Sequence, residues 1–191
     1  MITGIVLASA SPRREQLLRQ VNCDFRVMPS SAEENNEADL PPVELVQLHA
    51  RAKAQDVAGT ISSDEIVIGA DTIVVLDGKV YGKPGNSEEV CRMLKELSGR
   101  THSVWSGVAV VGNSQCFTDA VETRVTLGVL TPAQIQRYVA TGEPLDKAGA
   151  YAVQGLGAVF VDRIEGCYFN VVGLPLQALS RLLAKVGVDL L

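Results

Sequence analysis

A long apolar run at residues 66–76 constrains the fold of this chain more than any other segment. Its sequence, IVIGADTIVVL, is rich in β-branched residues and is typical of a strand inside a sheet. Its one charged side chain is Asp71, and burying an unpaired carboxylate costs several kcal/mol. We therefore expect Asp71 to have a lysine or metal partner, or to line a cleft. The alternative is a structural hydrogen bond at a strand end or bulge.

Strands and helices alternate along the chain, which predicts an α/β fold. The expected strands are 4–8, 25–27, 65–76, 79–81, 104–111 and 116–127. The expected helices are 12–21, 42–58, 87–97, 132–141 and one from about 175 onward. We expect a loop at 142–157, which carries four glycines, and a hairpin near Glu165-Gly166.

The chain has 191 residues, 47% of them hydrophobic, which suffices for one compact domain with its own core. It contains no repeat, low-complexity tract or obvious linker, so we predict a single domain over residues 1–191. Its 17 basic and 22 acidic residues give a formal net charge of −5. That balance provides no general attraction for nucleic acid or for an anionic membrane.

The cysteines and histidines argue against several classes of site. The four cysteines are scattered without a CxxC pair, and there are only two histidines, which argues against a zinc site. No GxSxG motif is present, which argues against a Ser-His-Asp hydrolase. No segment has the pattern of a signal peptide or the roughly 18 apolar residues of a membrane span. We expect a soluble, cytoplasmic protein.

Residues 9–14, SASPRR, join the first expected strand to the first expected helix. Free N–H groups at a helix start bind anions, and Ser9 and Ser11 add hydroxyl groups there. Positive charges at a helix start interact unfavourably with the helix dipole, so Arg13 and Arg14 are costly there. A bound polyanion would offset this cost, which points to a phosphate site. The alternative is that Ser11 only caps the helix while both arginines are solvated.

Two lysines are further candidates for binding phosphate. Lys53 lies on the same helix face as Val46, Ala50 and Val57, where a snorkelling stem is the alternative. Lys83 follows the 79–81 strand in a segment that lacks the spacing of a P-loop. By itself it is explained as well by an ordinary surface lysine.

A late loop and an acidic pair complete the candidates. Residues 146–155 offer Lys147 and Gln154 as donors between glycines that permit close approach of a ligand. Glu34, next to Glu33, offers oxygen ligands for a metal. A plain surface loop and an acidic surface pair are the alternatives. Together, the anion-binding groups and the carboxylates suited to Mg²⁺ favour phosphate-ester or nucleotide chemistry over acyl transfer or redox chemistry.

The chain resembles the Maf family of nucleoside triphosphate pyrophosphatases in segments that span nearly its whole length. These segments are LASASPRR (7–14), AEE (32–34), Lys53-Ala54, IGADTIVVLDGKVYGKP (68–84), LSGRTHSV (97–104), EPLDKAGAYAVQGLGAVFV (143–161) and NVVGLPL (170–176). The departures are small. Trp105-Ser106 replaces a small residue and Thr, and Ala152 replaces a Gly.

This resemblance implies a fold and a reaction. The fold is a strongly twisted mixed sheet with flanking helices and two lobes around a nucleotide cleft, similar to the inosine triphosphate pyrophosphatases. The reaction is hydrolysis between the α- and β-phosphates of a nucleoside triphosphate, with Mg²⁺ or Mn²⁺. The partner we expect is this substrate, neither nucleic acid nor membrane, and a homodimer is left open.

The resemblance also implies roles for the candidate residues. Phosphate binding falls to Ser9, Ser11, Arg13 and Arg14, and Lys147 would also contact substrate. Glu34 and Asp71 would organise metal and water, with Asp71 as the proton acceptor. Lys53 and Lys83 would neutralise developing charge.

Three positions resemble the branch of the family that acts on dTTP and UTP. They are Arg13, Thr72 and Gln154, where the branch acting on 7-methyl-GTP has Trp, Gln and Glu. Two functions of other classes stay open. One is a nucleotide-binding regulator of cell division without turnover. The other is a nucleotidyl or sugar-phosphate transferase with an acceptor other than water.

Overall fold

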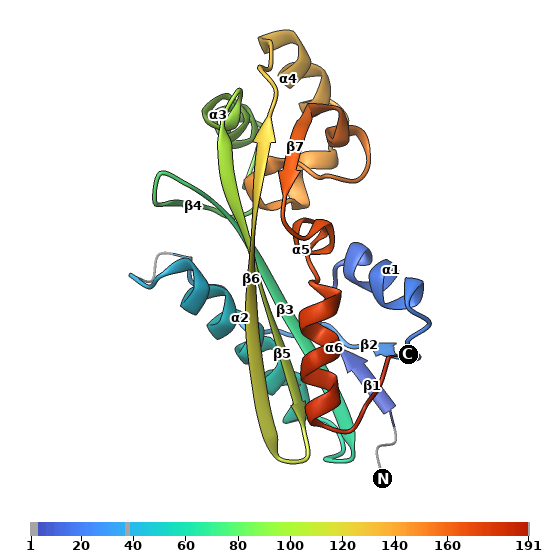
Figure 1. The fold of residues 1–191 in the computed structure, drawn as a ribbon. Coiled ribbons are helices and arrows are strands. Elements are labelled where there is room, and N and C mark those ends of the chain that lie inside the picture. Colours follow the sequence, from blue (N-terminus) through green and yellow to red (C-terminus); the bar gives the residue numbers. More distant parts are fainter. Residues whose placement is uncertain (1–3, 37–38, 191) are drawn as a thin grey trace. The chain divides into compact units, whose positions relative to one another are not determined.

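In the computed structural model, which describes residues 4–36 and 39–190, seven strands form one twisted, mixed sheet (Figure 1). The strands are β1 (Gly4–Leu7), β2 (Arg26–Val27), β3 (Glu65–Leu76), β4 (Lys79–Tyr81), β5 (Thr101–Gly112), β6 (Gln115–Leu127) and β7 (Val161–Glu165). Their order is β2-β1-β3-β5-β6-β7, and β4 pairs with β3. β1 runs parallel to β2 and β3, whereas β3–β4 and β6–β7 are antiparallel.

Helices lie between the strands, as the alternating pattern predicts. The α-helices are α1 (Pro12–Gln20), α2 (Pro42–Ala58), α3 (Ser87–Leu97), α4 (Pro132–Val139), α5 (Tyr168–Val172) and α6 (Leu176–Lys185). Three short 3-10 helices are η1 (Glu143–Asp146), η2 (Ala148–Ala150) and η3 (Leu156–Phe160). The expected mixed α/β fold with flanking helices is therefore confirmed.

Packing divides the chain into two compact units. The first unit comprises Met1–Thr72, Ser106–Val121 and Gly173–Leu191, and the second comprises Ile73–Trp105 and Glu122–Val172. The strands β3, β5 and β6 each contribute residues to both units. Two units correspond to the two lobes that the family resemblance implies.

In the first unit, α2 packs directly onto β3 and β5 because two glycines remove the side chains between them. A Cβ at Gly69 would lie 2.2 Å from the carbonyl oxygen of Ala50, and one at Gly107 would lie 2.2 Å from that of Val46. Small buried residues of α2 complete this contact, Ala50 and Ala54 among them. The close approach brings the inner face of α2 against the backbone of both strands.

The second unit has its own hydrophobic core beneath α3 and α4. α3 packs against α4 and η2 and buries Val90, Leu94 and Leu97. α4 begins with a capping box in which Thr131 and Gln134 satisfy each other's backbone N–H groups. The expected start of this helix at residue 132 is thus confirmed.

Two details differ from the sequence expectations. The stretch 142–157 is not a plain loop but includes η1, η2 and the start of η3. The hairpin expected near Glu165-Gly166 is wrong, because β7 pairs back to β6 and the chain turns at Gly166 into α5. Gly166 has a φ of 130°, and a Cβ there would lie 2.9 Å from Thr123 Oγ1. The glycine therefore serves a close approach to β6 and not a two-strand turn.

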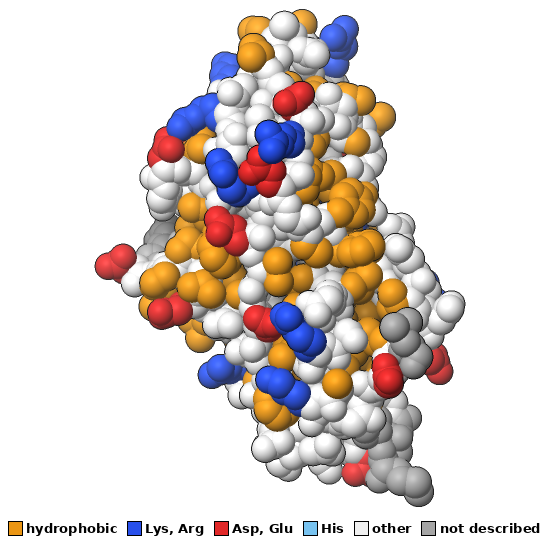
Figure 2. Space-filling view, viewed as in Figure 1, with side chains coloured by type: hydrophobic (Ala, Val, Ile, Leu, Met, Phe, Trp, Pro, Cys, Tyr) orange, Lys and Arg blue, Asp and Glu red, His pale blue; other side chains and the backbone are white. Residues whose placement is uncertain are grey.

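No helix in the described part of the chain is long and apolar enough to cross a membrane. On the face seen in Figure 2, acidic and basic side chains are interspersed among apolar and other polar groups.

Candidate active site

The alternation of side chains along β3 aims Asp71 at α2. Gly69 and Asp71 are two residues apart and so lie on the same face of the strand, the face onto which α2 packs. On α2, His49 and Lys53 are four residues apart and share one helix face. The contact opened by Gly69 therefore brings one carboxylate together with two nitrogen donors.

Both oxygens of Asp71 are engaged inside this contact. Lys53 Nζ lies 2.7 Å from Oδ1, and His49 Nδ1 donates to Oδ2 at 3.1 Å. Only 3% of Asp71 is exposed. Burial alone would raise the pKa of Asp71, but the hydrogen bond from His49 and the charge of Lys53 outweigh it and hold that pKa well below its ordinary value. Asp71 is therefore ionised at neutral pH, and its expected lysine partner is confirmed.

Glu34 contacts the same ammonium group from the other side. Its Oε1 lies 2.5 Å from Lys53 Nζ, and about a third of its side chain is exposed, whereas Asp71 is enclosed. The Nζ also donates to the carbonyl oxygen of Ala70 at 3.4 Å. Lys53 thus lies between two carboxylates, and its expected alternative, a snorkelling stem with a solvated head, does not apply.

The carboxylate pair also fits a divalent cation by the chemistry of its donors. No group of three or more His, Cys, Asp or Glu side chains in the described residues could hold a metal by itself. Mg²⁺, however, is commonly bound by one or two carboxylates together with waters and substrate phosphates. Glu34 and Asp71 both contact the Lys53 ammonium group, and their carboxylates are oxygen donors that could hold a divalent metal.

The side chain of Arg14 connects three segments of the first unit. Its Nε donates to the carbonyl oxygen of Gly173 at 2.8 Å, Nη1 to Ser9 Oγ at 3.1 Å, and Nη2 to Thr72 Oγ1 at 3.1 Å. Burial lowers the pKa of Arg14, and the nearby charge of Asp71 opposes that effect. The three bonds use three of the five guanidinium N–H groups, so two remain for a ligand.

Thr72 and Ser106 lie on the faces of their strands opposite to Asp71 and Gly107. Thr72 Oγ1 is 2.8 Å from Ser106 Oγ and also accepts from Arg14. The structure therefore places the Thr72 hydroxyl in an internal network.

The remaining residues of the SASPRR segment lie at the start of α1. Ser9 is buried, and its Oγ accepts from the backbone N–H of Ser11 at 3.2 Å. Ser11 occupies the N-cap position, but its side chain makes no capping hydrogen bond. Arg13 is half-buried in the first turn. The capping role considered as the alternative for Ser11 is thus wrong.

The other predicted site residues, Lys83, Lys147 and Gln154, belong to the second unit. Lys83 is exposed and has no hydrogen bond or ion pair with the described residues. Lys147 pairs with its neighbour Asp146. The backbone N–H of Gly149 donates to the carbonyl oxygen of Gly82 at 3.1 Å, which joins the Lys147 segment to the Lys83 segment.

His49 is the residue of this site that sequence reasoning missed. Its spacing of four from Lys53 was the available signal, since both must point from one helix face. Its Nε2 is buried and has no hydrogen-bond partner among the described residues. His49 therefore contributes to the site through Nδ1, which orients the Asp71 carboxylate.

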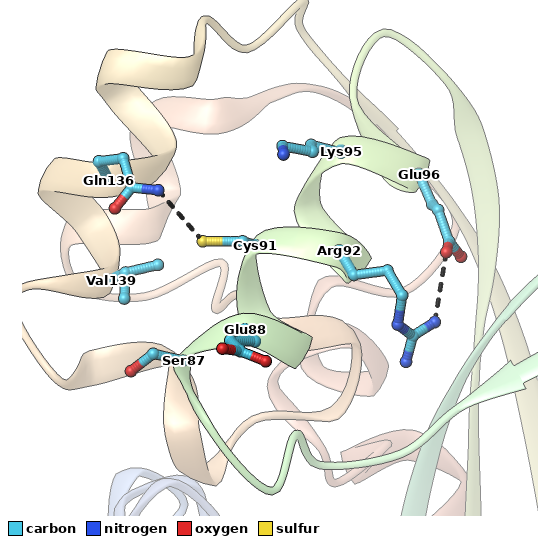
Figure 3. Close-up of a pocket in the computed structure, with 8 residues that line it drawn as sticks. All are labelled: Ser87, Glu88, Cys91, Arg92, Lys95, Glu96, Gln136 and Val139. Atoms are coloured by element: carbon cyan, nitrogen blue, oxygen red, sulfur yellow. Dashed lines mark hydrogen bonds and ion pairs between the residues drawn. The ribbon is translucent and has the colours of Figure 1, made fainter.

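The second unit also has a surface groove, which none of the predicted site residues lines (Figure 3). It runs between α3 and α4 and is lined by Ser87, Glu88, Cys91, Arg92, Lys95, Glu96, Gln136 and Val139. Gln136 Nε2 donates to Cys91 Sγ at 3.5 Å, and Arg92 pairs with Glu96 at 3.2 Å. No residue predicted for the site lines this groove.

Comparison with known proteins assigns the chain to a class. A family model described as Maf-like protein matches residues 4–186, and the chain belongs to this family. A dTTP/UTP pyrophosphatase of Moorella thermoacetica is 53% identical, with 98% of this chain and 97% of the relative covered. One of Gloeobacter violaceus is 49% identical, with 97% of each covered.

Two solved structures align with this chain at low sequence identity. The Ham1 protein of Staphylococcus aureus aligns with a TM-score of 0.46 and 16% identity, covering 64% of this chain and 71% of that one. A dITP/XTP pyrophosphatase of Mycobacterium abscessus aligns with a TM-score of 0.45 and 12% identity, covering 95% and 94%.

Proposed function

We propose that this protein hydrolyses dTTP and UTP to the nucleoside monophosphate and pyrophosphate. The observation that carries the proposal is the cluster in which Asp71 and Glu34 meet at the Lys53 ammonium. Such a cluster suits a reaction at a charged phosphate, where catalysis depends on positioning and on charge stabilisation. The name that near-full-length relatives carry supplies the substrate class and the acid-anhydride bond that is cleaved.

In the proposed reaction, water attacks the α-phosphorus and the bond from that phosphorus to the bridging oxygen breaks. Pyrophosphate leaves with the electron pair of that bond. Asp71 accepts the hydrogen bond of the attacking water and takes its proton as the new phosphorus–oxygen bond makes the water acidic. The lowered pKa of Asp71 makes it a weak base towards water itself, so it receives this proton late in the step.

The positively charged side chains stabilise the triphosphate in this proposal. Arg13 and the two spare N–H groups of Arg14 bind phosphate oxygens, together with Ser9 and Ser11 at the start of α1. When bound, a divalent cation, Mg²⁺ or Mn²⁺, would screen the phosphate charge, and Glu34 and Asp71 would hold it. Lys53 holds both carboxylates in place.

In this proposal, three further residues contact the leaving group and the base. Lys83, which has no partner among the described residues, neutralises charge on the departing pyrophosphate. Lys147 adds a second cation. Gln154 hydrogen-bonds the edge of uracil or thymine, and Thr72 acts on selectivity through the Arg14 network. We also propose a cytoplasmic location, where such substrates are made, and a homodimer as a state to be tested by light scattering.

Product analysis of the wild-type protein and Asp71→Asn tests this function. With UTP and Mg²⁺, we expect UMP and pyrophosphate in equal amounts, and no change on adding sugar or alcohol acceptors. Asn fills the same volume but can neither take a proton nor neutralise a cation, so turnover should fall ~100-fold or more.

Asp64→Asn is the matched control, because Asp64 is an exposed carboxylate just before β3. A folded Asp71→Asn variant that keeps the wild-type kcat would refute the role of Asp71. A wild-type protein that binds UTP without releasing pyrophosphate would favour the regulator, and transfer to an added acceptor would favour the transferase.

A further inference from the structure

The carboxylate of Glu143 fastens the loop that follows Gln154. Its Oε2 accepts from the backbone N–H of Leu156 at 2.9 Å, and its Oε1 accepts from that of Gly157 at 3.0 Å. The hydroxyl of Tyr138 donates to Oε1 at 2.9 Å. These two backbone N–H groups open η3 and have no partner within that helix, so one side chain 13 residues away satisfies them.

The backbone at Gly155 is shaped around this carboxylate. Gly155 has φ 80° and ψ −153°, a conformation that is essentially restricted to glycine. A Cβ at this position would lie 2.7 Å from Glu143 Oε2. The carboxylate therefore sits against the backbone immediately after Gln154 and leaves the chain there little freedom to shift.

A second set of contacts fixes the chain before Gln154. The hydroxyl of Tyr151 is 2.7 Å from His102 Nε2, and the two rings pack edge to face with centroids 5.4 Å apart. Both side chains are at most 5% exposed. Gln154 thus lies between two anchors, while its own half-buried amide has no hydrogen-bond partner among the described residues.

Glu143 is suited to hold this loop because it is ionised. Burial alone would raise its pKa, but the N–H groups of Leu156 and Gly157 and the hydroxyl of Tyr138 outweigh that effect and lower it. An ionised carboxylate only accepts hydrogen bonds, and bonds to a charged acceptor are stronger than neutral ones. All three donors therefore face an acceptor with no competing proton.

We propose that Glu143 is a positioning residue that sets the discrimination between uracil or thymine and cytosine by holding Gln154 in place. This inference rests on the proposed function, in which Gln154 hydrogen-bonds the base edge. An amide offers a donor at one atom and an acceptor at the other, so it discriminates bases only while its orientation is fixed. A released loop lets the amide turn and accept from the exocyclic amine of cytosine.

The experiment compares kcat/KM for UTP and CTP in the wild-type protein, Glu143→Gln and Tyr138→Phe. In Glu143→Gln the amide NH₂ faces a backbone N–H, so one of the two hydrogen bonds from the loop backbone to residue 143 is lost. The side-chain volume is kept. We expect the UTP to CTP ratio to fall by ~3-fold or more, with kcat for UTP changing less than the ratio. Tyr138→Phe removes one donor and keeps the ring, and a smaller fall in the ratio is expected.

Glu165→Gln is the matched control, since Glu165 is a partly exposed carboxylate of β7 in the same unit. A folded Glu143→Gln variant with the wild-type ratio, or with equal losses for both substrates, would overturn this inference alone. If Glu143→Gln does not fold, an unchanged ratio in Tyr138→Phe overturns it. A wild-type protein without pyrophosphate release would overturn both this inference and the proposed function.

Discussion

Acidification should destabilise this protein through a buried neutral histidine, His102. This side chain anchors Tyr151, which precedes Gln154 in the second unit. The His102 side chain is 3% exposed and is hydrogen-bonded to the Tyr151 hydroxyl. Burial lowers the pKa of His102 from 6.5 to about 4. The unfolded chain regains the ordinary pKa, so between these two values it binds a proton that the folded protein excludes.

The sign and size of the effect follow from this difference. Stability from the buried neutral ring is fully present above pH 6.5 and is lost progressively as the pH falls towards 4. The two pKa values differ by about 2.5, and each pH unit is worth about 1.36 kcal/mol. The free energy of unfolding should therefore fall by about 3 kcal/mol from this group alone.

The assay is urea unfolding of the wild-type protein and His102→Gln at a series of pH values from about 7 to about 4. Gln places an amide near the position of Nε2 for Tyr151 and gains no charge in acid. Titrating carboxylates are common to both proteins, so the difference between their unfolding free energies isolates His102. We expect the wild type to lose about 3 kcal/mol relative to the variant over this range. Two curves that stay parallel would refute the reasoning.

Substitutions at three further residues test individual roles. Lys83→Ala should lower kcat more than it raises KM in steady-state assays, because the charge it neutralises develops in the transition state, and a raised KM alone would make it a ground-state anchor. Gln154→Glu replaces the amide donor with a charge and should reduce the kcat/KM preference for UTP over CTP, which an unaltered ratio would contradict. His49→Leu removes the donor to Asp71 and should lower kcat by ~10-fold, the worth of about one hydrogen bond to a charged group. His49→Asn, which keeps a donor near Nδ1, should restore most of that loss, and a failure to do so would assign His49 a packing role.

The pairing of Asp71 could be predicted from the sequence because its cost is local. A carboxylate in an otherwise apolar strand needs a partner. Lys53 lies on a helix whose small, apolar face indicates that the helix is buried against the sheet. The contribution of His49 could not be predicted in the same way. It depends on which strands α2 packs against. Gly69 and Gly107, which lie in two separate strands, allow that packing because they have no side chains.

The conformation of residues 142–157 in the second unit could not be predicted from the sequence. Glycines at 142, 149, 155 and 157 indicate a flexible segment, yet η3 begins where the Glu143 carboxylate satisfies its first N–H groups. The conformation depends on a side chain distant in sequence and on the Tyr151–His102 contact. Local propensity contains neither of these interactions, so it gave a plain loop.

The most direct test of the proposed function is a panel of nucleoside triphosphates assayed for pyrophosphate release by the wild-type protein. The panel is dTTP, UTP, dCTP, CTP, ATP and GTP, each with Mg²⁺ and over a range of concentrations that yields kcat/KM. A site built around the hydrogen-bonding edge of uracil or thymine leaves polar groups unpaired with any other base, at roughly 1–3 kcal/mol per group. We therefore expect dTTP and UTP to exceed every other substrate by at least ~10-fold in kcat/KM. Equal values for UTP, CTP, ATP and GTP would contradict the proposed preference for dTTP and UTP. The absence of pyrophosphate release from every substrate would contradict the proposed pyrophosphatase activity.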